Sequence, residues 1–217
     1  MLGFNSKQLI GVGIFLFMIF IGVPLTIGVT GRWDFYFTLT SVALLAIASA
    51  GVWLTFYIGR INIGQGAFAL IGAYVSAILV VKAGWSFWIS LPAAGLFAAV
   101  VAILIGLPIL RLRGVYFAMI TLVLTQVVTL TALALPITNG ARGISNIPLP
   151  SGISLLGISV VPDFAAMENT KLAFYYTACI IMILTYAALY RLVNSRLGHL
   201  CRSMQQNEEL ASSIGVN

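Results

Sequence analysis

The chain has 217 residues, of which 61% are hydrophobic and only 7% are charged. Soluble globular domains carry far more charge, so the composition excludes that class and places most of the chain in lipid. The net charge of +6 comes without a run of Lys and Arg, so it is typical of the positive-inside rule of membrane proteins and gives no support to a nucleic-acid partner.

Six apolar segments are long enough to cross a membrane, since a spanning helix needs about 20 residues. In chain order they are 8–29, 37–58, 63–81, 86–110, 115–135 and 172–193. The first is too long for the apolar part of a signal peptide, and no small-residue cleavage site follows it, so we expect it to remain as a helix. The predicted fold class is all-α: a polytopic transmembrane helical bundle of about six spans, forming a single domain over residues 1–217.

Polar side chains occur at the start of the third span and within the fifth. Asn62, Gln65 and Gly66 stand at the membrane edge, and Thr125 and Gln126 lie inside the fifth span. A threonine hydroxyl can bond back to its own helix, so the threonine alone means little. An amide is harder to satisfy and usually faces the bundle interior or a water-filled cavity. These five residues are predicted to line a translocation pathway or a helix-packing contact.

Arg111 and Arg113 form a tight basic turn between the fourth and fifth spans. We predict that they are membrane-edge anchors for phospholipid headgroups, with a direct contact to a cytosolic protein as the alternative. With the polar tail in the cytosol and the spans alternating, seven of the 11 Lys and Arg fall inside: Lys7, Arg60, Arg111, Arg113, Arg191, Arg196 and Arg202. This bias predicts a cytosolic N-terminus and tail, with the 136–171 connector outside.

Residues 195–217 are the only long polar run in the chain. They favour a helix from about Leu197 to Ser212, which Gly215 is placed to end. Glu209, Ala211 and Gly215 have the spacing E-x-A-x-x-x-G. A short polar helix at a membrane face suits docking into a groove on a soluble partner, and a solvated juxtamembrane helix is the alternative.

The sequence carries no recognisable catalytic or metal-binding arrangement. It lacks the G-x-x-x-x-G-K-[ST] phosphate loop, so it does not hydrolyse ATP by that route. His199 is the only histidine, and Cys179 and Cys201 have no metal-ligand spacing. No predicted span has a carboxylate or lysine in its middle, which weakens the case for a proton-coupled pump. We therefore expect no enzyme activity, cofactor or metal on this chain.

Several stretches together match one known pattern. Residues 64–68 and 72–74 read G-Q-G-A-F and G-A-Y, residues 110–118 read L-R-L-R-G-V-Y-F-A, and residues 138–148 contain T-N-G, G-I and I-P. With the tail, these stretches resemble, in the same order, the LivM-type permease of branched-chain amino acid ABC importers. The resemblance makes residues 195–217 an EAA-like coupling loop. Its ATPase-coupling positions would be Arg202, Asn207, Glu208, Glu209, Ala211 and Gly215. His199 and Gln205 stand where that family has arginine, so the loop is less basic than usual.

The resemblance implies a permease subunit of the bacterial inner membrane that translocates branched-chain amino acids or similar small polar solutes. Its expected partners are a second, LivH-like permease, two cytosolic ABC ATPase subunits that hold ATP and Mg, and a periplasmic solute-binding protein. Such permeases continue with further spans after the loop, so the chain is expected to be C-terminally incomplete or a shortened relative. The alternatives are an importer for urea, short amides or sugars, an ATP-independent channel or secondary transporter, and a purely structural membrane subunit.

Overall fold

The computed structural model describes residues 18–31, 33–112, 114–155, 158–161, 164 and 169–206. Over these residues the chain is predominantly helical, which confirms the all-α class apart from one short hairpin. It divides into two compact units. We call residues 1–50 with 168–217 the terminal unit and residues 51–167 the central unit.

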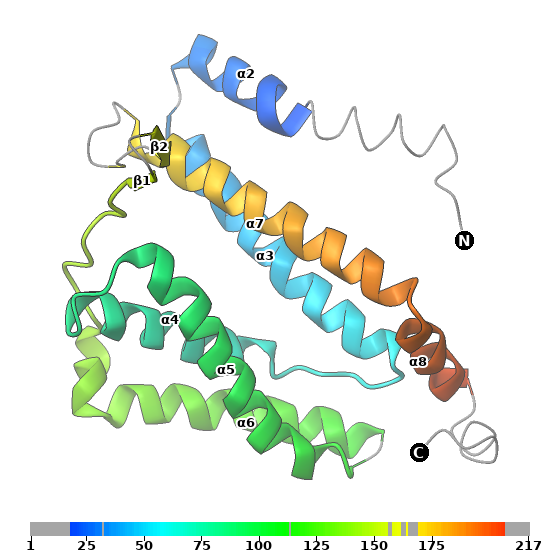
Figure 1. Ribbon diagram of the computed structural model, residues 1–217. Coiled ribbons are helices and arrows are strands. Elements are labelled where there is room, and N and C mark those ends of the chain that lie inside the picture. The colour runs from blue at the N-terminus through cyan, green and yellow to red at the C-terminus, as the bar shows by residue number, and fades with distance from the viewer. Residues whose placement is uncertain are drawn as a thin grey trace, which may run out of the picture. The chain divides into compact units, whose positions relative to one another are not determined.

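The elements follow one another along the chain as Figure 1 shows. The helices are the π-helix η1 (Met18–Gly22), α2 (Val23–Thr30), α3 (Phe35–Tyr57), α4 (Gln65–Val81), α5 (Phe87–Ile109), α6 (Val115–Ala134), the 3-10 turns η2 (Pro136–Thr138) and η3 (Gly140–Arg142), α7 (Thr170–Val193) and α8 (Arg196–Gln206). Strands β1 (Ile153–Leu155) and β2 (Ile158–Val161) pair antiparallel within the predicted outer connector.

Four of the described helices, α3, α5, α6 and α7, are long and apolar enough to cross a membrane. They coincide with the second, fourth, fifth and sixth predicted spans. The third predicted span is the 17-residue helix α4, which at 1.5 Å per residue reaches roughly 25 Å, short of a hydrocarbon core about 30 Å thick. The first predicted span is described only from Met18 onward. The count of about six spans therefore stays a prediction.

Small side chains bring α4 against α5 in the central unit. The hydroxyls of Ser76 and Ser90 are 3.1 Å apart, and Ser90 is completely buried. One turn before Ser76 on α4, a Cβ on Gly72 would lie 4.0 Å from the Cβ of Ala98 on α5. Small residues let helix backbones approach closely in lipid, where packing rather than the hydrophobic effect drives association. Helix α4 packs in this way against α5, and it also contacts α6 (Figure 1).

The connector after α6 is tied to the neighbouring helix ends of the same unit. The ammonium of Lys82, at the end of α4, donates to the carbonyl of Ile137 at 2.8 Å. The indole of Trp88, at the start of α5, donates to Ser151 O at 2.9 Å, and its ring meets Phe164 edge-on. The C-terminal end of α4, the N-terminal end of α5 and this connector thus share one end of the unit.

A proline disrupts the first segment of the terminal unit, and two tyrosines compensate. In an α-helix the N–H of residue 24 would serve the carbonyl of Phe20, and in a π-helix that of Ile19, but Pro24 has no N–H. Tyr175 donates to Ile19 O at 2.9 Å, and Tyr176 donates to Phe20 O at 3.2 Å. Both tyrosines come from α7, so this helix fastens the irregular segment.

Helices α3 and α7 run side by side (Figure 1). Their rings meet where Tyr36 packs on Tyr175, within a buried cluster that includes Cys179. At the nearby helix starts, the ammonium of Lys171 lies 2.6 Å from the carboxylate of Asp34. This hydrogen bond and the positive charge lower the pKa of the Asp34 carboxyl from its ordinary value. The pair is exposed, so it contributes little to stability.

The compensation at Pro24 can be measured as a coupling. Tyr175→Phe should lower the free energy of unfolding by about 1 kcal/mol, the scale of a hydrogen bond between membrane helices. In a Pro24→Ala background the segment can form a regular helix, so the same change should cost clearly less. SDS titration of the purified protein measures this double-mutant cycle.

Tyr186→Phe is the matched control for this cycle. Its hydroxyl donates at 3.1 Å to Ala46 O, a carbonyl inside α3 that keeps its helical partner. The control should cost the same in both backgrounds. An equal cost of Tyr175→Phe in both backgrounds would contradict the compensation.

Candidate functional site

A non-helical break at residues 58–64 separates α3 from α4. Backbone groups in such a break need partners when they lie at membrane depth. The Asn62 side-chain oxygen accepts from Gly64 N at 2.8 Å, a local turn that asparagine favours. Ile63 N donates to the Thr121 hydroxyl at 3.1 Å, and that hydroxyl donates to Ala118 O at 2.9 Å. The buried Thr121 on α6 therefore anchors the break.

Two glycines allow the α3–α4 break to lie close to α6 and the Gln65 side chain to lie close to α3. A Cβ on Gly64 would lie 3.1 Å from the Thr121 carbonyl oxygen, so this position lets the chain lie against α6. A Cβ on Gly51 would lie 3.0 Å from the Gln65 amide nitrogen, so the Gln65 side chain covers the backbone of α3. The next residue, Gly66, approaches Thr125 at ordinary contact distance.

Four of the five predicted pathway residues thus lie together around the α3–α4 break and the middle of α6: Asn62, Gln65, Gly66 and Thr125. The acceptor of Asn62 is used inside the turn, so its first role is to shape the break. Thr125 bonds back to Thr121 O at 3.2 Å, as expected for a helical threonine. Their position beside a pathway stays a prediction.

Gln126 occupies a different face of α6. It is exposed, and its neighbours one turn away, among them Leu122, Val123 and Leu130, are exposed as well. The part of the chain that the structure describes gives its amide no hydrogen bond. In lipid such an amide needs a partner. Its predicted contact therefore has to come from outside this bundle.

Arg60 has a structural role that the sequence reasoning missed. Its guanidinium donates to Leu110 O at 2.7 Å and to Leu112 O at 2.6 Å, and it lies 5.6 Å from the centre of the Phe117 ring. The last carbonyls of a helix lack intrahelical partners, and a cation there also complements the helix dipole. Arg60 thus joins the α3–α4 break to the α5–α6 turn. Its only sequence signal was its place in a polar connector.

The basic turn itself is exposed. Arg111 is exposed beside the Arg60 contact, and Gly114 closes the turn with φ +59°. Arg113 lies outside the described residues. The position of Arg111 at a helix end suits a membrane-edge anchor, and its lipid contact stays a prediction.

The tail contains the predicted helix, α8, which begins one residue earlier than expected and is described as far as Gln206. Leu197, Leu200 and Cys201 share one side at helical spacing, and both leucines are exposed. Arg202 is exposed on the polar side. The remaining predicted coupling residues lie outside the described residues: Asn207, Glu208, Glu209, Ala211 and Gly215.

The corner between α7 and α8 is closed by a glycine. Gly198 is buried, and a Cβ there would lie 2.1 Å from Val193 O, far inside contact distance. Asn194 Nδ2 donates to Tyr190 O at 3.0 Å, and the Ser195 hydroxyl donates to Leu192 O, so two of the last carbonyls of α7 have side-chain partners. The start of α8 thus packs directly against the end of α7. Sequence reasoning gave Gly198 no role.

Comparison with known proteins gives one consistent family. A family model described as the permease component of the branched-chain amino acid transport system matches residues 35–217. The chain is 33% identical over 172 residues to the high-affinity branched-chain amino acid transport system permease protein LivM of Escherichia coli K12, and 32% identical to that of Salmonella typhimurium LT2. Each match covers 73% of this chain, which spans 40% of the relative's length. No solved structure matches.

The role of Thr121 can be tested by an isosteric change. Thr121→Val keeps the shape but leaves Ile63 N–H without its acceptor, which should lower the free energy of unfolding by about 1–3 kcal/mol. Thr121→Ser keeps the hydroxyl and should cost less. SDS titration compares the two variants, and a valine variant as stable as the serine variant would contradict the anchoring role.

Proposed function

The chain belongs to the family of branched-chain amino acid transport system permease components, and we propose that it is the membrane-spanning permease subunit of an ATP-binding-cassette importer. Its solutes would be branched-chain amino acids or similar small polar molecules. The observation that carries this proposal is the family match, which runs from α3 to the tail helix and so includes the four span-length helices found among the described residues.

The importer would need partners that supply the remaining parts. These are a second, LivH-like permease, two cytosolic ATPase subunits that bind ATP and Mg, and a periplasmic solute-binding protein. The chain would lie in the bacterial inner membrane with its N-terminus and tail in the cytosol. The basic end of the central unit, with Arg60 and Arg111, supports that orientation.

The tail would couple the ATPase to the spans. Arg202 on α8, with Asn207, Glu208 and the residues that follow, would contact the ATPase. Because Gly198 packs directly on the end of α7, a displacement of α8 has to move α7 as well. ATP binding and hydrolysis would in this way bias a two-state equilibrium of the spans from a distant site.

The break would border the solute pathway. Non-helical backbone at membrane depth is tolerated where protein buries it or where it lines a water-filled cavity. The polar groups of Asn62, Gln65 and Thr125 lie at this break. Gln126, exposed on another face, would contact the pathway or the second permease.

The coupling proposal is tested at Gly198. With the complete importer in proteoliposomes, labelled leucine uptake should require ATP. Gly198→Ala should insert normally but lower solute-stimulated ATP hydrolysis by about tenfold, since couplings between sites are typically 1–3 kcal/mol. Gly28→Ala is the matched control, because a Cβ at Gly28 meets nothing within 4 Å.

The outcomes separate the alternatives. Uptake that persists without the ATPase and follows an ion gradient would replace the importer with a channel or secondary transporter. ATP-dependent uptake of urea or a sugar in place of leucine would change the substrate. Normal coupling in Gly198→Ala would remove the proposed role of the α7–α8 corner.

The orientation is tested by cysteine labelling in a Cys201→Ser background. A membrane-impermeant maleimide should label Ser145→Cys in intact cells, because the proposed topology puts the connector after α6 outside. It should label Ser203→Cys only after permeabilisation. Labelling of Ser203→Cys in intact cells would reverse the topology.

A further inference from the structure

The connector after α6 begins with a tightly shaped loop. Four residues have positive φ: Asn139, Gly140, Gly143 and Asn146. The hydroxyl of the buried Thr138 donates to Leu135 O at 2.7 Å, and a Cβ on Gly140 would lie 3.0 Å from Leu133 O. Asparagine and glycine adopt this backbone most readily. The loop is therefore seated on the end of α6 in a defined shape.

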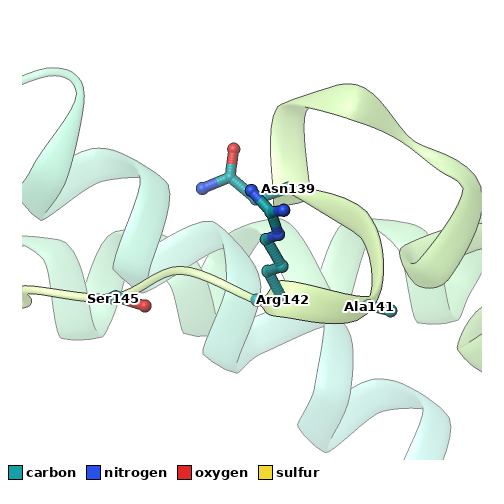
Figure 2. A pocket seen from close by; sticks show the side chains of 5 residues that line it. Asn139, Ala141, Arg142 and Ser145 are labelled. Atoms are coloured by element: carbon teal, nitrogen blue, oxygen red, sulfur yellow. The ribbon is translucent and has the colours of Figure 1, made fainter.

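This loop forms an open cavity of about 700 Å³. It is lined by Asn139, Ala141, Arg142, Gly143 and Ser145. The side chains of Asn139 and Arg142 project from the loop toward the same side (Figure 2). We call this cavity the Arg142 pocket. Its side chains offer a guanidinium, an amide and a hydroxyl, so hydrogen-bond donors converge on it.

Among the described residues of the central unit, no carboxylate balances this charge. The sequence has no Asp or Glu between Asp34 and Asp163, so the described part of the central unit has none. Arg142 is exposed and makes no ion pair within the part of the chain that the structure describes. Lys82 adds a second positive charge at the same end of the unit. A ligand with a carboxylate would match this end, and a guanidinium can hold one in a bidentate contact.

The pocket lies opposite the basic turn. Because α4, α5 and α6 alternate in direction, the Lys82 end is the far end from Arg60 and Arg111. With that basic turn in the cytosol, the Arg142 pocket opens outside.

We propose that the Arg142 pocket receives an acidic side chain from the soluble protein that delivers the solute, so that it is a docking point for that partner. This inference rests on the proposed importer function. A free amino acid fits less well, because its ammonium would lie beside the Arg142 guanidinium and the lining of the pocket offers it no carboxylate. Its aliphatic side chain would also find only Ala141 as an apolar side chain in the lining.

The test uses the complete importer in proteoliposomes and the purified solute-binding protein that supports its uptake. Arg142→Ala should weaken association of that protein by about fivefold at low salt, and Arg142→Glu by more than about tenfold, with a reduced salt dependence. Asn139→Gly keeps the positive φ and removes the amide, so it should have a smaller effect. Arg111→Ala removes one charge at the other end and should leave the association unchanged.

Each outcome decides the proposal. Restored association when Arg142→Glu meets a Glu→Lys variant of the binding protein would confirm the charge contact. Wild-type association of Arg142→Ala, with leucine uptake intact, would overturn this inference and leave the importer function standing. A raised KM for leucine with unchanged association would assign the pocket to the solute and overturn it too. Absence of ATP-dependent uptake by the wild-type importer would overturn both proposals.

Discussion

The structure depends on one constraint: in lipid, every backbone N–H and C=O needs a partner inside the protein. A regular helix supplies these partners within itself, so other partners are needed only where a helix ends or its hydrogen-bond pattern is interrupted. At Pro24 the missing N–H is compensated by tyrosine hydroxyls from α7. At the α3–α4 break Thr121 accepts the N–H of Ile63, and at the end of α5 Arg60 serves two carbonyls. In each case a side chain distant in sequence supplies the partner.

This constraint changes how the polar residues of an apolar chain are interpreted. Asn62 and Thr121 each bond to irregular backbone at the break, so their polarity has a structural reason. Their polar character alone would have suggested that both line a solute pathway. Bonding the backbone and lining a pathway are compatible roles. If solutes pass the break, its backbone groups need hydrogen-bond partners and its surface has to be accessible. The α3–α4 break is also the reason why α4 is short, since the residues that would extend it form the turn.

Hydropathy alone predicted the helices α3, α5, α6 and α7 closely, because length and apolar composition decide what can cross a bilayer. Sequence reasoning also grouped Asn62, Gln65 and Gly66, which are neighbours in the chain and lie at the α3–α4 break, and their part in a pathway stays a prediction. It could not predict the contact of Arg60 with the α5 end, because that pairing joins positions fifty residues apart. It likewise missed Gly198, where a Cβ would clash with Val193 O, because only the folded corner brings these two residues together. The sequence could not show that Gln126 is exposed either, because this depends on which face of α6 packs against the other helices.

The same constraint separates structural polar groups from those available to partners. Arg60, Thr121 and Asn194 are occupied by backbone atoms of this chain. Gln126, Arg111 and Arg202 have exposed side chains that the described residues leave without an ion pair or hydrogen bond. A solvated arginine costs little in water, but an amide on an apolar helix does not stay unpaired in a bilayer. We therefore predict that Gln126 marks a surface of the described spans that the chain completes only with a neighbouring protein or with water.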